Sequence, residues 1–203
     1  MELVVIRHAE TQANAEGRYQ GALDIGLNDD GVRQISCLAK KVAVAQQPFD
    51  RLLASPLLRT RESAAILSRQ LGLPVELVPA FRERDVGLFE GLTQVEARTR
   101  YPELWARNIT RRWADAPPGG ETIDEVIARV SLGLTELAST MQQGERILLV
   151  AHGVVAKVIR AVTIIGFDDF FEWQLPNSGM LSVRLSQADG GPLRFSRPLD
   201  GCD

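Results

Sequence analysis

Short apolar runs alternate along the chain with longer segments whose apolar residues recur every three or four positions. The short runs cover residues 3–6, 52–54, 75–78 and 147–151. Their length and their share of β-branched residues predict buried strands. The longer segments predict helices over 28–46, 56–71, 123–143 and 154–165. This alternation predicts an α/β fold, a three-layer α/β/α sandwich with a largely parallel central sheet.

Capping residues sharpen the ends of three of these helices. Asn28 is suited to the N-cap of the first helix, and Ser55-Pro56 follows the cap-then-proline rule for the second. Thr122 and Glu125 form a capping box ahead of the long third helix. Two late strands are expected over 180–185 and 193–195, at an edge of the sheet.

Loops and mixed segments fill the rest of the chain. Residues 9–27 and 81–91 are glycine-punctuated loops that follow predicted strands, where binding residues are often found. Residues 93–113 are helical in part and rich in Arg and Trp. We expect residues 1–203 to form a single domain, with a helical insertion near 92–120 that lies over the active site and sets substrate choice.

Charge and cysteine content narrow the class of protein. A net charge of -3 and a pI of about 5.5 argue against a general nucleic-acid binder. The longest apolar stretch, 147–167, is interrupted by His152, Lys157 and Arg160, and no signal peptide is visible, so no membrane association is expected. Cys37 and Cys202 do not form a disulfide framework, which favours a cytoplasmic location. Nothing in the sequence marks an oligomeric interface.

The chain contains only two histidines, and each comes at the end of a predicted strand, within two residues of its last apolar position. Arg7 and His8 come after residues 3–6, and His152 and Gly153 come after residues 147–151. Ligands of open α/β sheets bind at the carboxyl ends of the strands. The two histidines are therefore expected to meet at one site.

Arginines in the same positions point to a phosphoryl group as the ligand. Arg7 adjoins His8, and Arg59 opens the helix after the second strand. The planar guanidinium matches the oxygens of a phosphate, and backbone N–H groups of the helix that starts at Gly153 favour the same anion. Two histidines with carboxylates could instead hold a divalent metal, but the paired cations oppose a metal's charge.

A histidine among arginines is suited to nucleophilic catalysis. Neutral imidazole attacks phosphorus, and water or another acceptor then discharges the phosphohistidine. The leaving alkoxide needs a proton, for which Glu83 is the first candidate. The alternatives are Glu10, Asp85 and Glu90, each of which has a structural interpretation as well.

Six motifs in a fixed order resemble the histidine phosphatase superfamily, also called phosphoglycerate mutase-like, in its short bacterial phosphatase branch. They are IRHAETQAN, GRYQGALDIGLNDDG, ASPLLRTRESA, FRERDVGLFEG, PPGGET and VAHG, and NSGMLSV near the end also resembles the family. Each motif is weak alone, and their joint occurrence carries the resemblance. One departure is Ala9, where many members have glycine.

The resemblance implies roles for individual residues. His8 would be the phosphorylated nucleophile, and Glu83 the proton donor. The phosphate pocket would be completed by Arg7, Arg59, His152 and Asn14, and a segment that closes over the substrate would include Gln20 and Gly21. The family needs no metal or other cofactor.

These inferences predict a metal-independent phosphomonoester hydrolase that acts on a small phosphorylated metabolite through a phosphohistidine. A phosphoglycerate mutase is the alternative enzyme, although the compact chain favours hydrolysis. A phosphate-binding module without catalysis is the alternative of another class. A second anion or a ring of the substrate could contact the arginine-rich segment, whose candidate residues are Arg98, Arg100, Arg107, Arg111, Arg112, Trp105 and Trp113.

Overall fold

The fold is built on a six-stranded sheet with the order β3-β2-β4-β1-β5-β6. A computed structural model describes residues 1–44, 47–186 and 194–196. The strands are β1 (Glu2–Arg7), β2 (Arg51–Ala54), β3 (Val75–Leu77), β4 (Arg146–Ala151), β5 (Met180–Ser186) and β6 (Arg194–Ser196). The first four strands in this order pair in parallel, and β5 and β6 are antiparallel to their neighbours.

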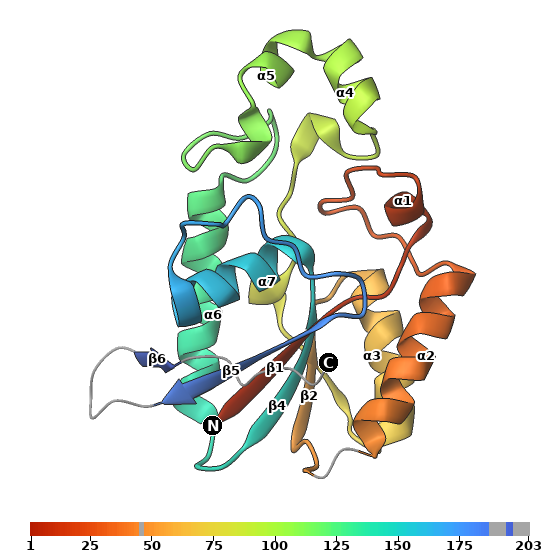
Figure 1. The fold of residues 1–203 in the computed structure, drawn as a ribbon, viewed down its shortest axis with the longest axis vertical. Helices are drawn as coiled ribbons and strands as arrows, with labels where there is room; N and C mark the ends of the chain where they lie inside the picture. The colour runs from red at the N-terminus through yellow and green to blue at the C-terminus, as the bar shows by residue number, and fades with distance from the viewer. Residues whose placement is uncertain (45–46, 187–193, 197–203) are drawn as a thin grey trace.

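Helices cover both faces of the sheet and give the predicted three layers. Figure 1 shows α2 (Asp29–Ala43) and α3 (Leu58–Leu71) on one side, with α6 (Ile123–Thr140) and α7 (Gly153–Arg160) on the other. Alternate residues of β1 enter different cores: Leu3 and Val5 pack with the α6 and α7 side, while Val4 and Ile6 pack with the α2 and α3 side. The predicted fold class is confirmed.

Two predicted helix caps agree with the structure, one predicted start is wrong, and two helices end three residues before the predicted bound, α2 at Ala43 and α6 at Thr140. Asn28 caps α2 by accepting from the backbone N–H of Gly31, and the Thr122–Glu125 capping box is present. In contrast, Ser55-Pro56 does not start α3, which begins at Leu58 after an N-cap at Leu57 that lacks a side-chain bond. The reason is that the hydroxyl of Ser55 contacts a histidine instead of capping the helix.

Two further boundaries differ from the prediction. The α7 helix ends at Arg160 and continues as a π-helical turn over Ala161–Ile165. Of the two late strands, β6 lies at the edge of the sheet as predicted, whereas β5 lies between β1 and β6. Leu193 and Cys202, which the sequence interpretation used, lie outside the described residues.

A cap segment, residues 94–120, lies beyond the carboxyl ends of the strands (Figure 1). It contains α4 (Gln94–Arg100), α5 (Pro102–Ala106) and a 3-10 turn over Ile109–Arg111, and the short α1 (Gln12–Ala15) lies beneath it. Two more 3-10 turns, Pro79–Phe81 and Gly87–Phe89, flank the loop that leads from β3 toward this segment. A small core that includes Phe89, Leu92 and Ile109 packs the cap against that loop.

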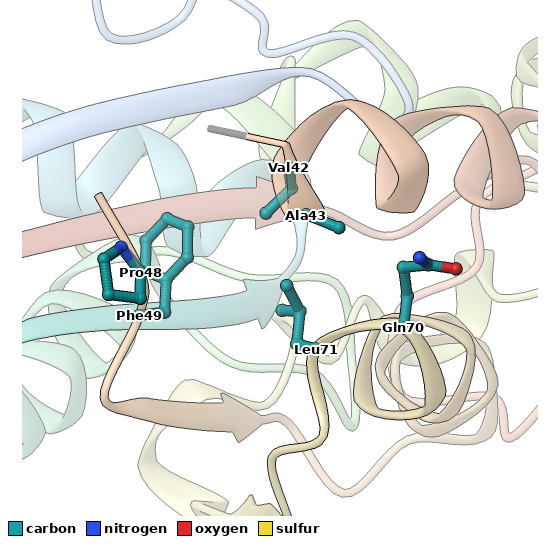
Figure 2. Close-up of a pocket in the computed structure, with 6 residues that line it drawn as sticks. All are labelled: Val42, Ala43, Pro48, Phe49, Gln70 and Leu71. Atoms are coloured by element: carbon teal, nitrogen blue, oxygen red, sulfur yellow. The ribbon is translucent and has the colours of Figure 1, made fainter. Parts of the chain in front are cut away.

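A hollow of about 190 Å³ lies at the opposite end of the molecule, between the last turns of α2 and α3 and the segment that enters β2. Figure 2 shows its six lining residues: Val42, Ala43, Pro48, Phe49, Gln70 and Leu71. Gln70 supplies its one polar side chain. The hollow therefore offers no charge to a ligand.

Across the described residues, no helix combines the length and the apolar content that a membrane crossing needs.

Candidate active site

Parallel pairing of β1 with β4 brings the two histidines together, as the sequence predicts. Arg7 is in register with Ala151, so the residues that follow each strand lie side by side at the carboxyl edge. The ring centroids of His8 and His152 are 5.3 Å apart, edge to face. His8 is 3% exposed and His152 is fully buried.

A cavity of about 180 Å³ opens at this edge between the sheet, the loop after β1 and the loop before the cap segment. Seven of the nine predicted site residues line it: Arg7, His8, Asn14, Gln20, Gly21, Arg59 and Glu83. The other two, His152 and Gly153, are not lining residues but adjoin the cavity. A Cβ on Gly153 would lie 3.8 Å from Nε of Arg7 and from Oε2 of Glu83.

The hydrogen bonding of His8 leaves Nε2 as its free ring nitrogen. Nδ1 lies 2.7 Å from the carbonyl oxygen of Ala9, which can only accept, so Nδ1 carries the hydrogen. Burial, with the positive charges of Arg59 and Arg7, lowers the pKa of His8 well below its usual value of 6.5. The ring is therefore neutral at physiological pH, and Nε2 holds the lone pair that a nucleophile needs.

His152 is also neutral, and a serine holds its ring. Burial, followed by the charge of Arg59, lowers the pKa of His152 well below 6.5. Nε2 hydrogen-bonds to Oγ of Ser55 at 2.7 Å, and Nδ1 is buried with no partner among the described residues. This nitrogen is the ring atom left for a ligand.

Arg59, which is buried, and Arg7, which is half-buried, have no carboxylate partner within ion-pair distance in the described part of the chain. Arg7 Nη1 donates to the carbonyl oxygen of Leu175 at 2.8 Å. Arg59, which is fully buried, donates through Nη1 to Leu23 O at 2.7 Å and through Nη2 to Gly21 O at 2.8 Å. In both guanidiniums the Nε atom is buried and unpartnered.

Burial lowers the pKa of Arg59 to about 10, because the charged form has lost its hydration. Burial likewise lowers the pKa of Arg7, and the carboxylate of Glu83 opposes this shift. Both side chains still carry a positive charge at neutral pH. Two positive charges beside a neutral imidazole define a site for an anion with several oxygens.

Glu83 is the only one of the four candidate acids that lines the cavity. Its Oε2 accepts from the backbone N–H of Val154 at 3.2 Å, and its Oε1 accepts from the N–H of Arg84 at 2.9 Å. The three alternatives have structural bonds elsewhere. Glu10 accepts from Asn28, Asp85 from the N–H of Gly87, and Glu90 from the N–H of Ala22.

Gly21 is required by the backbone at the mouth of the cavity. Its φ of +51° favours glycine, and a Cβ there would lie 2.1 Å from Oε1 of Glu90. Because Arg59 bonds to the carbonyl oxygens on either side of Ala22, the loop and the buried cation hold each other in place.

The arginine-rich cap residues do not line the cavity. Arg111 forms an ion pair with Glu172 at 2.5 Å, and Arg107 forms one with Asp115 at 2.5 Å. The ring of Trp113 packs against three phenylalanines, nearest Phe171 at 4.8 Å. A contact of Arg111, Arg112 or Trp113 with substrate therefore stays a prediction.

Sequence reasoning missed several polar residues that support or line the site, among them Arg18 and Tyr19, which line the cavity. Three more support it through the contacts that they make. Ser55 holds His152; Ser63 accepts from the N–H of Ala9 and donates to the carbonyl oxygen of Arg59; Arg84 lines the cavity. Ser55 could have been predicted from the sequence, because it directly follows β2 just as His8 directly follows β1. The positions of Ser63 and Arg84 could not be predicted, because Ser63 reaches Ala9 through the packing of α3 and Arg84 is held by a bond to Thr110 of the cap segment. Among the described residues, no cluster of three or more His, Cys, Asp or Glu could hold a metal ion.

Comparison with known proteins defines the family. Residues 3–195 match the histidine phosphatase superfamily (branch 1). The chain therefore belongs to this superfamily and is a histidine phosphatase. Relatives and structural neighbours that are named as phosphatases support phosphatase activity in the broad sense.

Individual relatives differ in what their names say they act on. The chain is 37% identical to phosphoglycerate mutase-like protein 4 of Arabidopsis thaliana, over 77% of this chain and 68% of that protein. It is 31% identical to the metal-independent phosphoserine phosphatase of Arabidopsis thaliana, over 78% of this chain and 66% of that protein. The structure matches that of mycobacterial glucosyl-3-phosphoglycerate phosphatase with a TM-score of 0.82 and 25% identity, over 95% and 94% of the two chains.

Proposed function

We propose that this chain is a metal-independent phosphomonoester hydrolase that transfers the phosphoryl group of a small metabolite to Nε2 of His8 and then to water. The observation that carries the proposal is the state of His8: a neutral ring with Nδ1 bonded to a carbonyl and Nε2 free, beside two unpaired arginines. Such a nitrogen can attack phosphorus without first losing a proton.

The surrounding charges suit the steps of this reaction. Arg7 and Arg59 stabilise the charge that spreads over the equatorial oxygens of the transferred group. In the proposed cycle Glu83, a lining residue, donates a proton to the leaving alkoxide and then accepts one from the attacking water, so that protons balance. The same cations oppose a divalent metal, which supports chemistry without one.

The size of the cavity supports a small substrate. Its volume of about 180 Å³ is below the roughly 300–1,000 Å³ of sites for drug-sized ligands. A cytoplasmic location is part of the proposal and is supported by the exposed free thiol of Cys37.

The test is hydrolysis of an aryl phosphate in EDTA by the wild type and His8→Ala, with a rapid base quench to trap a base-stable, acid-labile phosphoenzyme. We expect turnover that resists the chelator, is lost in the variant and forms a phosphoenzyme in the wild type alone. Loss of activity in EDTA would contradict metal independence. Turnover only with added phosphoglycerate would indicate a mutase, and phosphate binding without either reaction would indicate a binding module.

A further inference from the structure

Asn177 lies in the loop that leads into β5, and its side chain contacts both segments at the phosphate end of the cavity. Nδ2 donates to the carbonyl oxygen of His8 at 3.0 Å and to Oδ1 of Asn14 at 3.2 Å. A backbone carbonyl can only accept a hydrogen bond. The contact with His8 therefore fixes which end of the Asn177 amide faces these two residues.

The orientation of the Asn14 amide follows from the same logic. Its Oδ1 accepts from the backbone N–H of Thr11 at 3.2 Å and from the Thr11 hydroxyl at 3.1 Å, as well as from Asn177. A backbone N–H can only donate, so a flipped Asn14 amide would place NH₂ against two donors at once. Oδ1 is thus held on the protein side, and Nδ2 is the donor that Asn14, a lining residue, offers to an anion.

The backbone around Asn177 is fixed to the end of β1. The N–H of Ser178 donates to the carbonyl oxygen of Arg7 at 3.1 Å, and the N–H of Arg7 donates to Gly179 O at 3.1 Å. Ser178 has a φ of 57°, a left-handed conformation that is unfavourable for a residue with a Cβ. Such conformations persist only where the surroundings hold them, and they cluster at functional sites.

We propose that Asn177 is a positioning residue of this site, which keeps Asn14 turned so that its Nδ2 donates to the bound phosphoryl group. Asn177 is not among the lining residues and acts only through Asn14 and the His8 carbonyl. The proposal rests on the phosphatase function proposed above. It extends the site to a residue 163 positions from Asn14 along the chain.

The test is a double-mutant cycle between positions 177 and 14, with two measurements: the Kd of inorganic phosphate by calorimetry and kcat/KM with an aryl phosphate. Asn177→Ser removes the amide NH₂ and leaves a shorter side chain without adding charge, and we expect it to weaken phosphate binding about 2- to 10-fold, as for one neutral hydrogen bond. Asn177→Asp places carboxylate oxygens, which only accept, against two acceptors, and we expect the phosphate affinity of this variant to fall at least about tenfold. In an Asn14→Ala background, Asn177→Ser should change either quantity less than about twofold, because no amide remains to orient.

Asn108→Asp is the matched control, since Asn108 is an exposed asparagine with a φ of 51° in the cap segment, and its phosphate affinity should equal that of the wild type. If Asn177→Ser has no effect, or the same effect with and without Asn14, Asn177 does not position Asn14. A wild type that neither binds phosphate nor hydrolyses the ester would overturn the proposed function as well. Phosphate binding with independent effects would overturn the role of Asn177 alone.

Discussion

Two hollows of nearly equal volume and opposite chemistry lie at opposite ends of the sheet. The hollow at the amino end, about 190 Å³, is lined by apolar side chains and one amide (Figure 2). The cavity at the carboxyl end, about 180 Å³, is lined by four arginines, a histidine and a glutamate among others. Lining charge alone does not distinguish the two ends, because a further hollow of about 470 Å³ at the amino end is lined by Asp50, Arg51 and Glu145. What distinguishes the carboxyl end is that Arg7 and Arg59 have no carboxylate within ion-pair distance among the described residues.

Two of the four arginines at the cavity, Arg7 and Arg59, differ in their partners from the arginines of the amino end. Arg18, which also lines the cavity, pairs with Glu16 and Glu96. At the amino end, Arg51 pairs with Glu76 at 2.7 Å, and Arg146 pairs with Glu2. At the carboxyl end, Arg7 and Arg59 bond only to backbone carbonyls in the described part of the chain. A cation that is withdrawn from water without a counter-charge is costly to folding, which supports the role in anion binding proposed above for these two arginines.

The largest effect is expected from Arg59→Met. This change removes a buried charge and both bonds to the cavity loop, so kcat/KM for an aryl phosphate should fall about 10²- to 10³-fold. Steady-state kinetics and thermal unfolding of both proteins check this. An unchanged kcat/KM would mean that the unpaired cation is not part of the site.

Glu83→Gln should separate proton donation from binding. We expect kcat to fall about 10²-fold for an alkyl phosphate, whose leaving group needs a proton, and much less for a nitrophenyl phosphate, whose leaving group does not. The measurement is kcat for both esters with the wild type and the variant. Equal losses on the two substrates would argue against a general acid at this position.

The two histidines should make stability depend on pH. Their folded pKa values are lowered below 6.5, so the unfolded chain binds more protons in weakly acidic solution, and stability falls as pH drops below about 6.5. Each histidine contributes at most about 1.4 kcal/mol per pH unit to this slope. Urea unfolding between pH 5 and 7.5 measures it, and His8→Gln should reduce it. An unchanged slope in that variant would place the titration elsewhere.

The smallest effect on activity is expected from Arg146→Met at the amino end. This variant loses the ion pair with Glu2 and the contact of the guanidinium with the Phe49 ring, 4.5 Å from the centroid. Stability should fall by about 1–3 kcal/mol, while kcat/KM stays within about twofold. Chemical denaturation and aryl phosphate kinetics provide the comparison with Arg59→Met. A loss of activity similar to that of Arg59→Met would remove the contrast between the two ends.

Local signals were enough to predict much of the fold. The four parallel strands, the cap of α2 at Asn28 and the capping box of α6 depend on neighbours within a few residues, and the sequence shows them directly. The pairing of His8 with His152 was also predictable, because both follow strands whose carboxyl ends must share one edge of a parallel sheet.

The sequence by itself determined which residue types stand at the ends of the strands, and so the chemistry available at that edge. Only the tertiary structure decided which of four acids enters the cavity, that Ser55 holds His152 instead of capping α3, and that Asn177 reaches Asn14. These choices depend on strand order and on loops that meet from distant parts of the chain. The physical reason is that periodicity and capping act over one or two turns, whereas hydrogen-bond partners in a folded site are selected by packing.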